Sequence, residues 1–255
     1  MFTTRPELQG NFGMVSSTHW LASAAGMALL EAGGNAFDAA VAAGFTLQVA
    51  EPHLNGPGGD LPVIFAGPDA APTVLCAQGP APAGARIEHY RSLGLNLVPG
   101  SGLLAAAVPG ATAGWLTLLR DHGTARLRDV LDSAIHYART GIPVLPSIAR
   151  TIGAVAQLFR DDWTPSAALY LSAGSAPGAG DWHRNPAWAT TLRRLLTEAE
   201  AATSDRDRQI EHALSSWTSG FVADAIDSFA RTAWRDSSGE RHPSVLTGDD
   251  LATWR

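Results

Sequence analysis

The chain has 255 residues, of which 45% are hydrophobic and 16% are charged, and its formal net charge at pH 7 is -6. A chain of this length can bury a sizeable core, as one large domain or two small ones. The acidic balance argues against a surface that follows nucleic-acid phosphates and against one that binds anionic membranes, so neither partner is expected.

The N-terminus and the single cysteine bear on where the protein works. Residues 1–7 carry no basic stretch followed by an apolar run, so we expect no signal peptide. The most apolar helical stretch, residues 39–50, falls short of the roughly 20 residues that span a bilayer. Cys76 has no disulfide partner, and its apolar neighbours predict a small core residue in a strand. Together these features predict a cytoplasmic protein.

The first 50 residues predict a short strand and two helices. Residues 14–17 have the composition of a strand, and the alanine-rich run at 20–31 predicts a helix that a pair of glycines ends. Asn35 can cap a second helix over residues 36–49. This second helix is apolar on nearly every side, which is typical of a helix buried between other layers.

A loop rich in glycine and proline follows at residues 51–60, where no regular element is expected. Short apolar runs at 63–65 and 74–76, split by a turn at 67–69, predict a β-hairpin. Residues 86–92 predict one short helix. A sheet of two strands is too small to cover the apolar helix at 36–49, so we expect further strands outside this chain.

The chain from Pro109 onward predicts an almost wholly helical region. Apolar residues recur there at helical spacing in three stripes, at residues 127–138, 188–199 and 217–229. Thr247 or Gly248 would cap a final short helix with acidic residues in its first turn.

The tandem glycines Gly58 and Gly59 are candidate substrate-binding residues. Glycine lets a backbone approach a ligand closely, or lets successive N–H groups point together at an anion. The loop lacks the Gly-Lys-Ser/Thr of a P-loop and the Gly-x-Gly-x-x-Gly of a dinucleotide fold. His19 and His53 lack partners at metal-ligand spacing, so we interpret them as hydrogen-bonding frame residues. No cofactor or metal is indicated.

Four segments in a fixed order carry a more specific signal. Residues 13–23 and 30–43 are followed by Glu-Pro-His at 51–53 and by Gly-Pro-Gly-Gly at 56–59. This order resembles the γ-glutamyltranspeptidase family of N-terminal-nucleophile hydrolases. Shorter matches continue as far as Ala252, so the resemblance covers essentially the whole chain. They are Pro109-Gly110, Gly123-Thr124, residues 138–141 and residues 246–252.

The resemblance implies an α+β fold, in which this chain is the helix-rich part of a four-layer αββα sandwich. It also implies a precursor that cuts itself into a large and a small subunit, with the new N-terminal threonine of the small subunit as nucleophile. The implied reaction is acyl transfer from a γ-glutamyl amide such as glutathione to water or an amino acid. Residues 1–255 would be the large-subunit portion, and the small subunit of the same precursor would be its partner.

No nucleophile is expected within the chain itself. Thr3 and Thr4 precede the first predicted strand, and Thr190 and Thr191 lie in the middle of a predicted helix. A Gly-x-Ser-x-Gly elbow, the alternative for a serine nucleophile, is absent from the sequence. The resemblance places the catalytic threonine beyond Arg255.

One departure from the family pattern concerns the substrate. The family places an arginine shortly after an Ala-Pro-Ala segment, where its guanidinium holds the α-carboxylate of the glutamyl group. Here Ala-Pro-Ala stands at 81–83, Ile87 occupies the expected position, and Arg86 is one residue early. Arg86 is therefore either the substitute carboxylate ligand or a surface arginine paired with Glu88.

Three functions follow from these observations. The first is γ-glutamyl transfer or glutathione hydrolysis, with this chain as the large-subunit part. The second is a cephalosporin (glutaryl) acylase-like amidohydrolase, because the shifted arginine resembles the acylase-like branch. The third is a non-catalytic scaffold or interaction protein that keeps the large-subunit fold.

Overall fold

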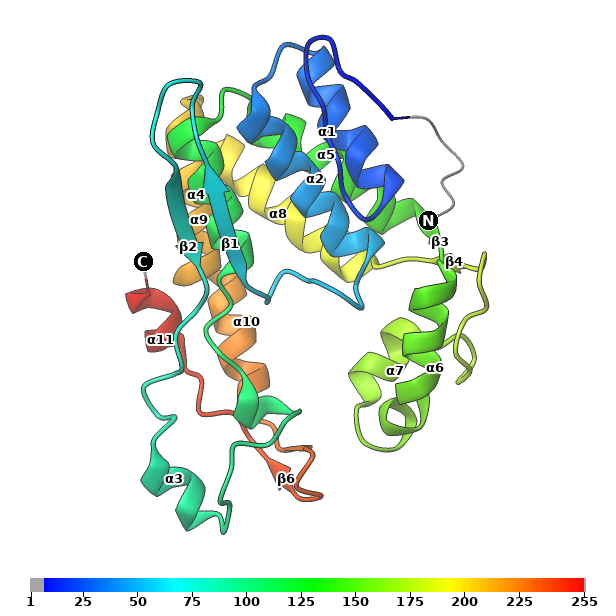
Figure 1. Cartoon of the computed structure of the whole chain (residues 1–255). Helices are drawn as coiled ribbons and strands as arrows, with labels where there is room; N and C mark the ends of the chain where they lie inside the picture. The colour runs from blue at the N-terminus through cyan, green and yellow to red at the C-terminus, as the bar shows by residue number, and fades with distance from the viewer. Residues whose placement is uncertain (1–6, 255) are drawn as a thin grey trace.

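The computed structural model describes residues 7–254 and shows a helix-rich α+β chain, which confirms the predicted fold class (Figure 1). The elements in its first half are α1 (Trp20–Glu31), α2 (Ala36–Ala50), β1 (Leu61–Phe65), β2 (Thr73–Ala77), α3 (Ile87–Ser92), the 3-10 helix η1 (Leu103–Ala105), α4 (Ala111–His122) and α5 (Leu127–Thr140). Those in its second half are β3 (Ile142–Pro143), α6 (Pro146–Asp161), α7 (Thr164–Tyr170), β4 (Trp182–His183), α8 (Pro186–Ala202), α9 (Arg206–Thr218), α10 (Phe221–Ala230), β5 (Trp234–Arg235), β6 (Arg241–His242) and α11 (Gly248–Thr253). The strands pair as three antiparallel two-stranded sheets, β1 with β2, β3 with β4 and β5 with β6.

Helix α2 lies at the centre of the fold, between α1, α4 and α5. Asn35 caps it by accepting from the backbone N–H groups of Phe37 and Asp38. Val41 is 0% exposed and Phe45 is 1% exposed. The prediction of an interior helix is therefore confirmed, and the reason is that α2 has no polar stripe to turn toward water.

The main core lies where α2, α4, α5, α8 and α9 meet. The predicted stripes at 127–138 and 188–199 form the buried faces of α5 and α8. The third stripe, at 217–229, is wrong as one continuous helix, because α9 ends at Thr218 and α10 starts after Gly220. A Cβ at Gly220 would lie 2.9 Å from the Cα of Ser216, so the chain turns there in tight contact with the end of α9.

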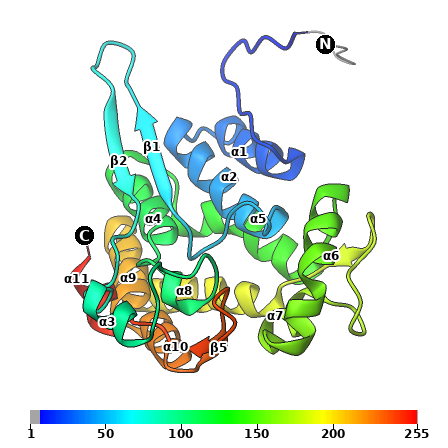
Figure 2. The same cartoon turned by 60° about the horizontal axis from the view of Figure 1, so that its bottom comes forward.

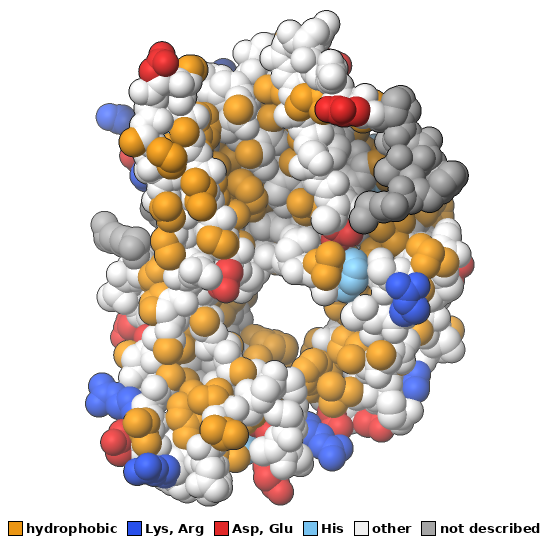
Figure 3. Space-filling view, in the orientation of Figure 1, with side chains coloured by type: hydrophobic (Ala, Val, Ile, Leu, Met, Phe, Trp, Pro, Cys, Tyr) orange, Lys and Arg blue, Asp and Glu red, His pale blue; other side chains and the backbone are white. Residues whose placement is uncertain are grey.

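The predicted hairpin is confirmed as β1 and β2, with Val63 opposite Leu75, and it lies across α4 (Figure 2). One face of the hairpin packs against α4, where Leu61 and Ala77 are buried. The other face is apolar yet exposed, and apolar side chains gather over this part of the molecule in Figure 3. The exposed residues are Pro62, Ile64, Val74 and Cys76.

Two local predictions near the sheet are wrong. Cys76 lies in a strand as expected, but its side chain is exposed, because alternation along β2 turns Leu75 and Ala77 toward α4. Residues 14–17 do not form a strand, since no strand pairs with them within the described part of the chain. The pair Thr3-Thr4 lies outside the described residues.

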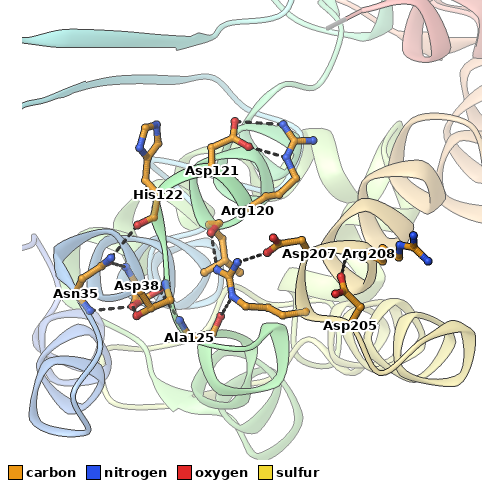
Figure 4. Close-up of polar contacts among 12 residues, drawn as sticks. Asn35, Asp38, Arg120, Asp121, His122, Ala125, Asp205, Asp207 and Arg208 are labelled. Carbon is orange, nitrogen blue, oxygen red and sulfur yellow. Dashed lines mark hydrogen bonds and ion pairs between the residues drawn. The ribbon is translucent and has the colours of Figure 1, made fainter.

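Asp38 joins the start of α2 to the connection between α4 and α5 (Figure 4). Its Oδ1 accepts from the backbone N–H groups of Thr124 at 2.8 Å and Ala125 at 3.0 Å. Its Oδ2 accepts from the backbone N–H of Asn35 at 2.8 Å and from the Thr124 hydroxyl at 2.7 Å. Burial raises the pKa of this carboxyl, but the hydrogen bonds outweigh burial and hold the pKa below its ordinary value. Asp38 is therefore a structural carboxylate whose two oxygens are both hydrogen-bonded.

The exposure of Cys76 is directly measurable. In the native chain without denaturant, we expect a thiol-specific reagent to modify Cys76 at a rate within about tenfold of that of a small free thiol, because the side chain is open to solvent. The measurement follows the absorbance of the aromatic thiolate that Cys76 releases from an aromatic disulfide reagent. The denatured chain is the control for full accessibility. Protection that disappears only on unfolding would contradict the placement of Cys76 on the outer face of the hairpin.

Candidate functional site

The loop from Asn55 to Asp60 is fixed to the helices on either side of it. The Asn55 side-chain amide donates to the Leu47 and Glu51 carbonyls at 3.2 Å each, at the C-terminal end of α2. The Gly59 carbonyl accepts from the backbone N–H of Ala111 at 2.8 Å, at the start of α4. The loop therefore connects the buried helix α2 to strand β1 while its position on α4 is held by hydrogen bonds.

A cleft of about 490 Å³ opens beside this loop. Its walls come from segments far apart in the sequence, namely the loop, the stretch from η1 to Pro109, helices α8, α9 and α10, and residues 244 and 246. Representative lining residues are Pro57, Gly58, Pro109, Trp188, Phe221 and Ala225. The lining contains no charged side chain among the described residues.

The two candidate glycines have different places in this arrangement. Gly58 is exposed and lines the cleft, and a Cβ added to it would lie 3.8 Å from the Cβ of Pro109, an ordinary contact. Gly59 closes a turn, since its N–H donates to the Gly56 carbonyl at 3.1 Å, and a Cβ there would lie 3.3 Å from that oxygen. The structure thus brings Gly58 to a cleft wall and gives Gly59 a role in shaping the loop.

Arg86 lies apart from the cleft lining. It is the residue before α3, its side chain is exposed, and its Nε donates to the Ala83 carbonyl at 3.1 Å. The neighbouring Ile87 is the first residue of α3 and is 65% exposed. Asp250 accepts from the backbone N–H of Ala83 at 2.8 Å and so holds this segment against α11. No ion pair between Arg86 and Glu88 is present in the described structure.

The two candidate frame histidines lie on other parts of the fold. His19 is 1% exposed and caps α1, where its Nδ1 accepts from the backbone N–H of Leu21 at 3.2 Å. Burial lowers the pKa of His19, with partial opposition from the charge of Glu51. His53 faces the α6–α7 segment and lines a small pocket with Tyr170. Neither histidine is part of the cleft lining beside Gly58.

Thr190 and Thr191 are bound within α8, as expected. Their hydroxyls donate to the carbonyls of Pro186 and Ala187 at 2.9 and 3.1 Å, one turn earlier in the helix. A peptide bond in mid-helix is a poor place to free a new N-terminus.

Within residues 7–254, no group of three His, Cys, Asp or Glu side chains is placed to hold a metal ion. Across the same described stretch, none of the helices combines the length and the apolar character that a membrane crossing requires.

Sequence reasoning missed the part of the site that α8, α9 and α10 supply. Trp188 in α8 and Trp217 in α9 both line the cleft. Both are also buried, at 8% and 3% exposure, so they belong to the core as well. No local signal could have found the cleft, because its walls meet only in the folded chain.

Comparison with known proteins assigns the family. A sequence model of gamma-glutamyltranspeptidase matches residues 22–255. The oxamate amidohydrolase proenzyme of Klebsiella pneumoniae is 37% identical over 192 residues, which cover 73% of this chain and 36% of that protein. The chain therefore belongs to the gamma-glutamyltranspeptidase family, and it spans about a third of the length of this curated relative.

Solved structures agree with the fold. The structure of LmbA2991HD matches with a TM-score of 0.96 and 55% identity, over 100% of this chain and 44% of that one. The cephalosporin acylase from Bacillus halodurans matches with a TM-score of 0.80 and 29% identity, over 100% of this chain and 45% of that one. The expected helix-rich part of an N-terminal-nucleophile hydrolase fold is thus confirmed.

Proposed function

We propose that this chain is the large-subunit part of an N-terminal-nucleophile amidohydrolase, and that the mature enzyme prefers amides whose acyl group is not γ-glutamyl and lacks the carboxylate that the family arginine holds. Membership of the gamma-glutamyltranspeptidase family supports an amidohydrolase or acyltransferase. The similarity to an oxamate amidohydrolase proenzyme and to a cephalosporin acylase supports an acyl donor other than glutathione.

The proposed chemistry divides between this chain and a segment that follows it. A threonine beyond Arg255, freed by self-cleavage of a precursor, attacks the amide carbonyl, and its own amine takes the hydroxyl proton. The C–N bond breaks, the proton goes to the leaving amine, and water then releases the acyl group from the threonine as a carboxylic acid. The role of the present chain is to bind and position the substrate and to carry the partner subunit, which increases the rate by holding the reacting groups in place.

The arrangement at Arg86 and Ile87 is the observation that carries the choice of acyl group. A γ-glutamyl donor has an α-carboxylate, and two parallel bonds from a guanidinium are the strong way to hold it. In this chain an exposed isoleucine stands at the matching position, and Arg86 directs its Nε to the Ala83 carbonyl. A glutaryl group keeps this carboxylate and lacks only the α-amino group, whereas an acyl group without a terminal carboxylate does not need this arginine.

One observation favours γ-glutamyl transfer as the second candidate. The guanidinium of Arg86 is exposed, and only its Nε has a hydrogen-bond partner in the described structure. A substrate carboxylate that enters from solvent would therefore find the two free terminal NH₂ groups one residue from the family position.

The two candidates differ in the amide they prefer. With the processed longer precursor, we expect kcat/KM for valeryl anilide, whose acyl chain has the same length but no carboxylate, to exceed that for γ-glutamyl anilide by about tenfold, because no well-placed guanidinium rewards the carboxylate. Arg86→Gln should change neither value by more than about twofold. Arg91→Gln, in the helix α3 that follows Arg86, is the matched control.

The opposite pattern supports the second candidate. A preference for γ-glutamyl anilide, together with a KM that Arg86→Gln raises and Arg91→Gln does not, would assign the carboxylate to Arg86 and reject the donor without a carboxylate. Lack of turnover of both anilides by a fully processed precursor would favour the non-catalytic scaffold.

A further inference from the structure

The β1–β2 hairpin has two edges, and its register shows which backbone groups each edge leaves free. Antiparallel strands alternate between pairs of residues that exchange two N–H···O bonds and pairs that exchange none. Pro62 lies opposite Cys76 and has no N–H to donate, so this pair is one that exchanges none. The same alternation makes Ile64 and Val74 the other pair of this kind.

The outer edge of β2 therefore carries unused hydrogen-bonding groups. Residues of the pairs that exchange no bonds turn their N–H and C=O groups away from the partner strand. In the part of the chain that the structure describes, these groups of Val74 and Cys76 have no hydrogen-bond partner. An edge of this kind is a template on which another extended segment can add as a strand.

The edge of β1 is less suited to a further strand. Pro62 faces this edge and offers no N–H, and a proline on an edge strand hinders further pairing. Helix α2 also lies on this side, since the rings of Phe65 and Phe37 meet edge to face with their centroids 5.2 Å apart. Figures 1 and 2 both place β1 between β2 and α2. The open edge of the hairpin is thus that of β2.

A groove of about 550 Å³ lies beside β2. Its lining comes from β2, α4, α9 and the end of α11, and includes Ala77, Gly114, Ser215 and Trp254. Neighbouring strands of a sheet lie about 4.8 Å apart, and successive side chains point to opposite faces. A strand paired with β2 would therefore lie over this groove and turn every second side chain into it.

The position of Trp254 indicates which segment reaches the groove. A Cβ added to Gly110 would lie 2.2 Å from the Ala77 carbonyl and 3.1 Å from the Trp254 ring. The chain therefore leaves α11 next to the last residue of β2. In the proposed precursor, the segment that follows Arg255 starts beside the open edge.

We propose that an extended segment of the longer precursor, from the part that follows Arg255, docks as a strand on the free edge of β2. The N–H and C=O groups of Val74 and Cys76 bond to its backbone, and its alternate side chains fill the groove over α4 and α9. The inference rests on the proposed function in requiring a precursor that continues past Arg255, whereas the docking itself requires no turnover.

The first test is amide hydrogen exchange of the 255-residue chain and of the processed precursor, measured by mass spectrometry with residue-level fragmentation. In the 255-residue chain, we expect the amides of Val74 and Cys76 to exchange within about tenfold of the rate of an unstructured chain. In the processed precursor, we expect both to exchange at least about 100-fold more slowly. The amide of Ile64 faces the edge of β1 and is the internal control, which should change by less than about tenfold.

The second test removes one outward N–H from each edge in turn. Val74→Pro takes away a donor of the β2 edge and leaves the bonded pairs of the hairpin intact, so it should lower the yield of co-purified, processed subunits at least about tenfold. Ile64→Pro makes the same change on the β1 edge and should leave the yield within about twofold. Equal thermal midpoints of the two variants in the 255-residue chain show that the hairpin tolerates both prolines.

Three results would overturn the inference. The first is protection of Val74 and Cys76 in the precursor that is no greater than that of Ile64, and the second is an equal loss of yield in both proline variants. The third is protection that already exists in the 255-residue chain and grows with its concentration, because a second copy would then occupy the edge. If the exchange pattern holds while the processed precursor hydrolyses no amide, the proposed function fails and the docking stands. Hydrolysis without this protection rejects the docking alone.

Discussion

The 255-residue chain by itself is expected to hydrolyse valeryl and γ-glutamyl anilides at least about 10⁴-fold more slowly than the processed longer precursor, because the proposed nucleophile lies beyond Arg255. Within the described residues, the threonine pair that the sequence offers, Thr190 and Thr191, is hydrogen-bonded inside α8. Binding a substrate without an activated nucleophile and oxyanion donors leaves most of the chemical barrier in place.

The measurement is a chromogenic assay of both proteins at equal concentration, followed long enough to detect very slow turnover. The double variant Thr190→Val, Thr191→Val in the short chain is the control. Both hydroxyls bond only within α8, so the exchange removes no contact to other elements. Turnover by the short chain that this double variant abolishes would show that the active site lies in α8.

Asp38→Asn is expected to lower the free energy of unfolding by about 3 kcal/mol at pH 7, which is a large effect for the exchange of one oxygen for an NH₂ group. The carboxylate accepts from three backbone N–H groups and the Thr124 hydroxyl, and it is 0% exposed. An amide offers a single acceptor oxygen, and its NH₂ group would face donors that lose their partner. Urea denaturation followed by circular dichroism measures the loss. Asp69→Asn, at an exposed turn between β1 and β2, is the control.

The same comparison has a defined pH dependence. The pKa of Asp38 is lower in the folded chain than in the unfolded chain, so its contribution is fully present above the unfolded pKa of about 4 and is lost as pH falls through the folded pKa. The difference between wild type and Asp38→Asn should therefore be constant from pH 5 to 7 and should shrink below about pH 4. A difference that stays unchanged down to pH 2.5, or that is under about 0.5 kcal/mol at pH 7, would contradict the assignment.

Local sequence signals predicted neither the cleft nor the way helices α6 and α7 pack. These two helices form an arm, residues 146–170, at one side of the molecule. Figure 3 shows an opening in the molecule between the α6–α7 region and the rest. Asp162, at the end of α6, pairs with Arg235 at 3.2 Å and with Arg241 at 2.7 Å, both on the β5–β6 hairpin. Trp163 also donates from Nε1 to the Arg235 carbonyl at 2.7 Å. These contacts hold the arm to the hairpin across a distance of more than 70 residues in the sequence.

The sequence alone determined the elements whose signals are local. Asn35 before an apolar run predicted the start of α2, and Thr247 with acidic residues predicted the capping box of α11. The helical stripes predicted the buried faces of α5 and α8. These predictions succeeded because caps and periodicity depend on residues within one or two turns of each other. The order of motifs over the whole chain also identified the family, which the comparisons confirm.

Only the tertiary structure decided features that depend on distant partners. Both faces of β2 are apolar, so the sequence could not tell that Cys76 faces solvent until α4 covered the opposite face. Residues 14–17 have strand composition but lack a neighbouring strand. The cleft beside Gly58 exists only because the loop, η1, α8, α9 and α10 converge around it. Side-chain burial and cleft formation are set by long-range packing, and local sequence patterns do not specify which segments will meet.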